Sequence, residues 1–181
     1  MKLIAINSSP RKDGNSDVIC QRLLQGAAEA GLETEKIDLR SMDLRPCTAC
    51  YACRQTGKCI QKDGMNELME KLIGADVIAL SSPVYFYSIC AQLKIFIDRC
   101  LPRYRELAGK SFVFIVTAAA PGHSAADETI ASMRGFLRCI PESVELATIF
   151  GTGTWDKGDV YKHPSYDEAY ELGKRLPEVM R

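Results

Sequence analysis

The clearest fold signal in the chain is residues 3–16, which read LIAINSSPRKDGNS. The apolar start, Leu3–Ile6, has the length and residue types of a buried strand. The polar loop Asn7–Ser16 follows, and it opens a predicted helix over Asp17–Ala30 that Gly31 is well placed to end. A buried strand, a loop and an amphipathic helix in this order form the first unit of a parallel α/β sheet.

The same alternation continues along the chain. Further strands are predicted at Thr34–Leu39, Asp76–Ser81, Ser111–Thr117 and Val144–Phe150. Apolar residues at three- and four-residue spacing predict helices at Met65–Ile73, Leu93–Cys100, Ile130–Ile140 and Tyr166–Leu176. Right-handed crossovers then require a doubly wound sheet of five parallel strands in the order 2-1-3-4-5, with helices on both faces. Because no repeat or linker is visible, we expect residues 1–181 to form one domain.

The composition is that of an ordinary globular protein, with 181 residues, 46% of them hydrophobic, 25% charged, and a formal net charge of zero. This balance, without Lys/Arg runs, argues against nucleic-acid and membrane-surface partners. No apolar run is long enough for a bilayer span or a signal-peptide core, so we expect a cytoplasmic protein. Eight cysteines in a reducing compartment then indicate metal ligation or redox chemistry rather than disulfides.

The first loop carries the groups of an anion site. Ligands of doubly wound sheets bind at the carboxyl ends of the strands, and the helix start there offers free amides and a positive dipole end. Ser9, Asn15 and Ser16 add hydrogen-bond donors, and Arg11 can bind a phosphate through two N–H groups. The loop matches neither a P-loop nor a dinucleotide fingerprint, which leaves a phosphomonoester as the expected anion. The alternative interpretation is a polar turn in which Asn15 or Ser16 caps the helix.

Two later loops suggest a flat ligand. Ser81–Ser88 holds the aromatic run Tyr85–Tyr87, on which a planar ring system could pack, although one or two of these rings could instead belong to the core. Ala118–Ser124 is small, and Gly122 permits close backbone approach to a flat ligand. His123 is either a proton donor at this site or a solvated surface residue.

A cysteine-rich insertion at about residues 41–63 interrupts the alternation. It contains Cys47-x-x-Cys50-x-x-Cys53, followed by Cys59. Compact spacing of this kind is typical of [4Fe-4S] ligation, whereas zinc more often takes two separated Cys-x-x-Cys pairs. The metal-free alternative is a cysteine-rich loop that packs near the ligand or a subunit interface.

The other four cysteines carry less information. Cys20, Cys100 and Cys139 lie on predicted helices and are most simply core residues. Cys90 begins the helix after the aromatic loop, where a helix start could activate its thiol.

Three motifs together resemble the NADPH-dependent FMN reductase and iron-sulfur flavoprotein superfamily, whose fold is flavodoxin-like. They are residues 9–16 (SPRKDGNS), 82–86 (SPVYF) and 92–99 (QLKIFIDR). Ser8 departs from the glycine that usually precedes the serine-proline pair. The resemblance covers nearly the whole chain, and it implies a homodimer or homotetramer with flavins near subunit interfaces.

The resemblance also implies roles for individual residues. It assigns the FMN phosphate to Ser9, Arg11, Asn15 and Ser16, and the ribityl chain and isoalloxazine to Pro83, Val84, Tyr85 and Phe86. The loop with Gly122 would face the pyrimidine end of the ring. The relatives that carry a [4Fe-4S] cluster have similar cysteine spacing, and Lys94, Asp98 and Arg99 look like a structural ion-pair set.

We therefore expect an FMN-dependent oxidoreductase without a catalytic side chain, because the flavin itself carries the electrons. NAD(P)H or a ferredoxin would reduce the flavin, and a small molecule would accept the electrons. One alternative is a non-enzymatic [4Fe-4S]/FMN electron carrier between redox proteins, although carriers usually present an acidic face that the balanced charge here does not suggest. Another is a redox- or metal-sensing module built on residues 47–59.

Overall fold

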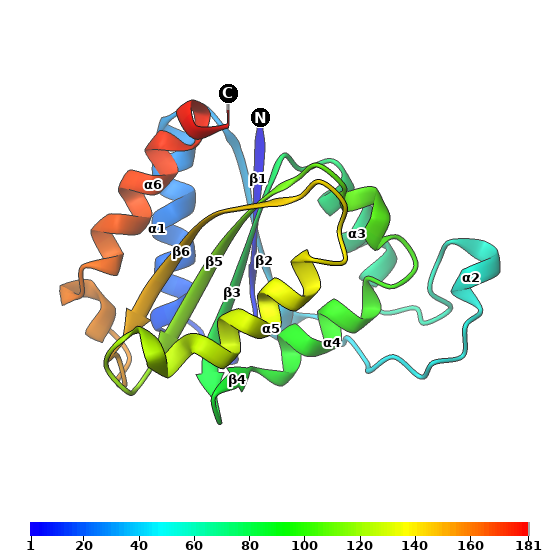
Figure 1. The fold of residues 1–181 in the computed structure, drawn as a ribbon, viewed down its shortest axis with the longest axis horizontal. Coiled ribbons are helices and arrows are strands. Elements are labelled where there is room, and N and C mark those ends of the chain that lie inside the picture. The colour runs from blue at the N-terminus through cyan, green and yellow to red at the C-terminus, as the bar shows by residue number, and fades with distance from the viewer. Residues whose placement is uncertain (181) are drawn as a thin grey trace.

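Five parallel strands form the centre of the protein in a computed structural model that describes residues 1–180. They are β1 (Lys2–Asn7), β2 (Glu33–Asp38), β3 (Val77–Tyr85), β5 (Ser111–Ala118) and β6 (Val144–Thr152). Their order across the sheet is β2-β1-β3-β5-β6 (Figure 1), which confirms the predicted 2-1-3-4-5 arrangement of the parallel strands. The two-residue strand β4 (Ser88–Ile89) pairs only with β3, in the antiparallel direction.

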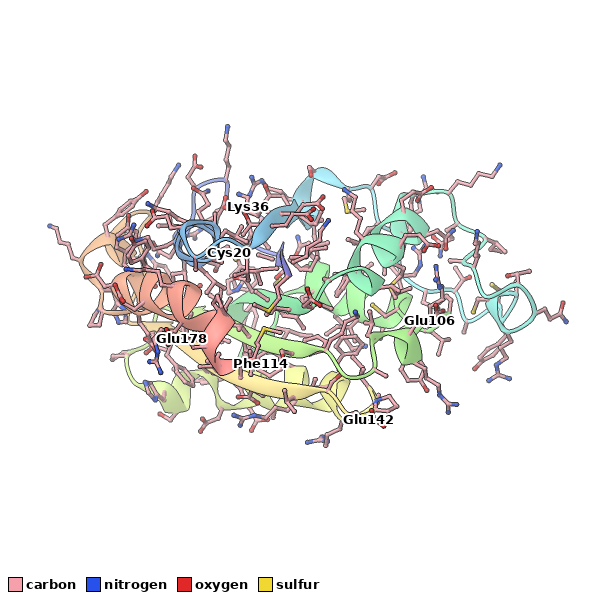
Figure 2. All side chains as sticks on the ribbon, turned by 90° about the horizontal axis from the view of Figure 1, so that it is seen from above. Cys20, Lys36, Glu106, Phe114, Glu142 and Glu178 are labelled. Carbon is pink, nitrogen blue, oxygen red and sulfur yellow. The ribbon has the colours of Figure 1, made fainter. Side chains whose placement is uncertain are left out.

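Helices cover both faces of this sheet, as predicted. One face packs against α1 (Asn15–Glu29) and α6 (Ser165–Val179), and the other packs against α3 (Met65–Ile73), α4 (Ala91–Arg99) and α5 (Asp127–Leu137) (Figure 1). Side chains alternate between the two layers along each strand, so neighbouring β1 residues belong to different apolar clusters. Figure 2 shows the side chains around the sheet and labels Phe114 on β5, which is fully buried.

Helices α1 and α6 approach closely because each has a glycine at the contact. A Cβ atom on Gly26 would overlap the main-chain carbonyl of Tyr170, and a Cβ atom on Gly173 would overlap that of Leu23. The two backbones therefore touch directly, and α6 fixes the position of α1 on the sheet.

The cysteine-rich segment has little regular structure, as predicted. One 3-10 turn at Leu39–Ser41 precedes it, and the single-turn helix α2 (Cys53–Thr56) lies within it. Figure 1 shows this segment projecting beyond α3 and α4 at one side of the molecule.

Several boundaries differ from the predicted ones. Helix α1 begins at Asn15 rather than Asp17, and α6 continues through Pro177 to Val179. A proline in the last turn removes only one helical hydrogen bond, and the preceding Leu176 is fully buried. The prediction that Cys139 is a core residue is wrong, because α5 ends at Leu137 and turns the next residues toward solvent.

None of the helices in the described part of the chain is both long and apolar enough to cross a membrane.

Candidate functional site

A cleft opens at the carboxyl ends of the parallel strands. These strand ends point to the bottom of the view in Figure 1. Its volume is about 190 Å³, and four separate segments of the chain line it. The lining residues are Ser9, Arg11, Asn15, Ser16, Pro83, Val84, Tyr85, Thr117, Ala118, Ala119, Thr154 and Trp155. Seven of the nine residues that we predicted for the flavin site therefore meet at one cleft. Phe86 and Gly122 do not line it.

The amino end of α1 forms one wall of the cleft. Gly14 precedes the helix in an extended conformation and no side chain caps it, so the alternative of an Asn15 or Ser16 cap is wrong. The Ser16 hydroxyl instead lies 2.6 Å from that of Thr117 on β5. The first-turn amides of α1 have no acceptors within the helix, so they remain available to an anion.

Arg11 and Ser9 lie on the loop that precedes this helix. The Arg11 guanidinium is exposed and donates from Nη1 to the main-chain oxygen of Trp155 over 3.2 Å. The Ser9 hydroxyl accepts from the Arg11 amide over 3.3 Å. A single hydrogen bond at the surface is weak enough for Arg11 to exchange it for a phosphate oxygen.

A buried carboxylate holds the loop in place from behind. Asp17 accepts a hydrogen bond from the Asp13 amide over 3.0 Å and forms ion pairs with Lys36 (2.5 Å) and Arg40 (3.1 Å). Figure 2 shows Lys36 on β2 beside α1, which carries Asp17. Burial alone would raise the pKa of Asp17, but hydrogen bonds from Lys36, Gln21 and the Asp13 amide lower it overall. Asp17 is therefore ionised near neutral pH and fixes Asp13, which has a positive φ of 53°.

The aromatic run forms a hairpin rather than the predicted loop. β3 continues to Tyr85 and pairs with β4, so Phe86 and Tyr87 are the two connecting residues. Their φ angles are 50° and 60°, the positive values that type I′ turns require and that bulky residues rarely adopt. Phe86 is fully exposed and Tyr87 is 67% exposed, so the alternative of core packing is wrong for both. The strained turn exposes two aromatic rings directly after Tyr85, which lines the cleft.

The loop after β5 divides between two cavities. Ala118 and Ala119 line the cleft, whereas Gly122 and His123 line a neighbouring cavity of about 570 Å³. His123 stacks on Phe150, with 4.0 Å between ring centroids and 13° between ring planes. His123 is exposed to solvent, as the surface alternative expects, and it packs one face of its ring on Phe150.

The four cysteines of the projecting segment line a small cavity of their own. Cys47, Cys50, Cys53 and Cys59 face it together, and the buried guanidinium of Arg99 forms part of its wall. In residues 1–180 no three His, Cys, Asp or Glu side chains converge closely enough to hold a metal ion as they stand. Arg99 pairs with Asp63 over 2.6 Å, and Lys94 pairs with Asp98 over 2.6 Å, which agrees with the structural role expected for these residues.

Sequence reasoning missed the contribution of the loop after β6. Thr154 and Trp155 line the cleft. The sequence signal for them is weak: the small residues Gly151–Thr154 end the last strand, and the single tryptophan of the chain follows them. Thr117, at the end of β5, was also missed because it looked like an ordinary strand residue.

Comparisons with known proteins agree with this geometry. The family model for NADPH-dependent FMN reductase matches residues 1–154. An iron-sulfur flavoprotein of Methanocaldococcus jannaschii is 33% identical, over 100% of this chain and 98% of that protein. An iron-sulfur flavoprotein of Archaeoglobus fulgidus is 34% identical, over 99% of this chain and 80% of that protein.

Among solved structures, an NAD(P)H:quinone oxidoreductase from Methanothermobacter marburgensis has the same fold. Its TM-score is 0.77 at 17% identity, over 98% of this chain and 97% of that one. An archaeal flavodoxin, with a TM-score of 0.62 at 15% identity over 99% of each chain, confirms the flavodoxin-like architecture. The chain therefore belongs to the NADPH-dependent FMN reductase and iron-sulfur flavoprotein family, and it is a flavin-dependent oxidoreductase.

Proposed function

We propose that the cleft holds FMN and that the bound flavin moves electrons from NAD(P)H to a small-molecule acceptor. The observation that carries this proposal is the meeting of the α1 amino end, Arg11 and the aromatic hairpin at one cleft. We also propose that residues 1–181 act as one FMN-binding domain, with the cysteine-rich insertion at about 41–63 as an added part.

The phosphate end of FMN fits the anion-binding wall. The amides of the first α1 turn and the hydroxyls of Ser9 and Ser16 would bind its oxygens. Arg11 would leave the Trp155 carbonyl and bind the phosphate through two N–H groups. Asp17 keeps the loop in the shape that these contacts need.

The ring end of FMN fits the rim of the cleft. A volume of about 190 Å³ is below the roughly 300–1,000 Å³ of pockets that enclose a drug-sized ligand. The ring would therefore extend outward along Pro83, Val84 and Tyr85, with Phe86 and the Gly122 loop at its outer edges. Bound FMN supplies the two-electron chemistry, and the chain binds it, orients it and leaves one face open to the reductant.

We propose further that Cys47, Cys50, Cys53 and Cys59 hold a [4Fe-4S] cluster. Their spacing and their shared cavity support this, as do the names of the two full-length relatives. The buried Arg99 beside them has an Nε–H without an acceptor among the described residues, and an anionic sulfur cluster would supply one.

We also propose a homodimer or homotetramer, which two features of the surface support. Tyr85, Phe86 and Tyr87 are exposed together, and a largely apolar cavity of about 820 Å³ lies beside them between α4 and α5. Exposed apolar surface of this extent is typical of an interaction site. A second copy of the chain would cover it and complete the environment of the flavin ring, while a ferredoxin remains the proposed alternative reductant.

The first experiment is an ultraviolet-visible spectrum, with iron and sulfide assays, of protein purified without oxygen. We expect flavin bands with a shoulder near roughly 400 nm, about four irons per chain, and bleaching of the flavin on addition of NADPH. Flavin bands without iron would leave an FMN reductase with a structural cysteine loop. A flavin reduced only by ferredoxin would identify an electron carrier, and absence of flavin after incubation with FMN would refute the proposal.

A further inference from the structure

Arg99 is an almost completely buried cation at the end of α4. Its side chain is 1% exposed, and it binds the two oxygens of Asp63 through Nη1 (2.6 Å) and Nη2 (2.9 Å). Nη1 also donates to the main-chain oxygen of Arg45 over 2.7 Å. A bidentate ion pair of this kind has a defined geometry, so it fixes the orientation of Asp63 relative to Arg99 as well as binding it.

These contacts close the cysteine-rich segment into a loop. The Arg45 amide donates to Asp63 over 3.2 Å, and Gln61 Nε2 donates to the main-chain oxygen of Pro46 over 3.1 Å. Residues 45 and 63 thus meet at one neck, and all four cysteines lie between them. Arg99 joins this neck to a helix that packs on the sheet.

One donor of Arg99 remains unused. Its Nε–H is buried and has no acceptor in residues 1–180, although buried donors are nearly always satisfied in proteins. Arg99 lines the same cavity as the four cysteines.

We propose that Arg99 is a positioning residue for the cysteine-bound cluster. Its Nη1 and Nη2 groups hold the neck through Asp63 and the main-chain oxygen of Arg45. Its Nε–H and its positive charge face the sulfur atoms. The inference rests on the cluster in the proposed function. Four thiolates around a [4Fe-4S] core carry net negative charge, and the charge becomes more negative on reduction. A buried cation at this place stabilises the reduced state more than the oxidised one, whereas Asp63 acts in the opposite sense.

Opposite shifts in the reduction potential test this arrangement. Arg99→Met removes the cation and the free donor at similar length, and we expect the cluster potential to become more negative. Asp63→Asn keeps Arg99 but removes the charge that compensates it, and we expect a more positive potential. Both variants loosen the neck, so iron affinity should fall by on the order of 10-fold. Cluster potentials would be measured by redox titration with electron paramagnetic resonance detection, alongside iron, sulfide and FMN content per chain.

Arg103→Met is the matched control, because Arg103 pairs with Glu70 and Glu106 nearby but does not line the cysteine cavity. Its iron content and cluster potential should equal those of the wild type. Arg99→Lys keeps the positive charge but cannot form the bidentate pair with Asp63. This variant should therefore bind iron more weakly than the wild type, but its cluster potential should shift less than that of Arg99→Met.

Unchanged iron content and potential in Arg99→Met and Asp63→Asn, or shifts of equal sign, would overturn the inference. If Arg99→Met loses FMN as well as iron, the variant has not folded. The inference is then tested by the directions in which Asp63→Asn and Arg99→Lys shift the cluster potential. Absence of iron and sulfide from the wild type would instead refute the cluster itself, which separates the two failures.

Discussion

Asn15 Nδ2 donates a hydrogen bond of 2.9 Å to the main-chain oxygen of Asp156, which joins the first residue of α1 to the loop after β6. The Asn15 carboxamide oxygen also accepts from the amides of Gly158 and Val160. The Asn15 side chain therefore shapes the cleft by holding the loop that carries Trp155. Arg11, with one exposed hydrogen bond, is the side chain left free to meet a phosphate.

Arg11→Gln should weaken FMN binding by about 10- to 100-fold, because it removes hydrogen bonds to a charged group worth about 1.5–3 kcal/mol. Riboflavin, which has no phosphate, should bind the variant and the wild type equally. Titration of flavin-free protein, followed by flavin fluorescence, measures both affinities. Lys12→Gln is the control, since Lys12 does not line the cleft. Equal losses for FMN and riboflavin would place the phosphate elsewhere.

Gly173→Ala should lower the free energy of unfolding by about 1–3 kcal/mol, because the new methyl group would overlap the backbone of α1. Gly135→Ala, in α5, meets only the flexible end of Arg138 and should stabilise the protein by about 0.5–1 kcal/mol. Denaturant unfolding of both variants provides the comparison. Similar stabilities would contradict the close contact between α1 and α6.

Stability should fall as the pH drops below about 4. The folded-state pKa of Asp17 lies below its ordinary value, and so does that of Asp63, where hydrogen bonds from Arg99 and the Arg45 amide outweigh burial. Their stabilising effect is present above the unfolded-state pKa and is lost as the pH falls through the folded-state pKa. Asp17→Asn should lower the free energy of unfolding at pH 7 by on the order of 3 kcal/mol. The melting temperature of this variant should also fall less steeply at low pH than that of the wild type. An equally steep fall would show that Asp17 does not contribute to the loss of stability in acid.

Five of the eight cysteines should react with iodoacetamide in native, metal-free protein, namely Cys47, Cys50, Cys53, Cys59 and Cys139. Cys20, Cys90 and Cys100 are buried, and burial raises the pKa of the Cys20 thiol to about 12. Peptide mass spectrometry identifies the labelled sites. In protein loaded with a cluster, Cys139 alone should remain reactive, and labelling of Cys50 there would argue against its role as a ligand.

Phe86→Ser should lower the molecular mass in solution to that of one chain, because it removes the most exposed aromatic ring of the proposed subunit contact. Light scattering after size-exclusion chromatography measures this. Tyr161→Ser, at an exposed aromatic ring that lines neither the cleft nor the apolar cavity, should leave the oligomer intact. A monomeric wild type would refute the proposed contact.

The sheet order was predictable because buried strands such as Leu3–Ile6 and Phe112–Val116 are continuous apolar runs. The hairpin was not, because Phe86-Tyr87 is far from the Asn-Gly pairs that signal such turns. Pro83 also concealed the end of β3, since proline lacks the N–H that a central strand usually donates.

The cleft was predictable in part for a related reason. The loop that follows the first apolar strand can be read from the sequence, and it supplies Ser9 and Arg11. Pro83 was also predicted to line the site, although it lies in β3 and not in a loop. The role of Asn15 could not be read, because its partners lie more than 140 residues away. Cys139 was misjudged because the apolar spacing of α5 continues past the last helical residue.

The two glycines between α1 and α6 also bear on how far the flavin site extends along the chain. The family match ends at residue 154, and α6 begins only at Ser165. Helix α6 nevertheless clamps the helix whose first turn faces the proposed phosphate. A chain shortened before α6 would keep every cleft-lining residue but lose the helix against which α1 packs. Helix α6 is therefore as much a part of the proposed cofactor scaffold as the loop that we propose touches the cofactor.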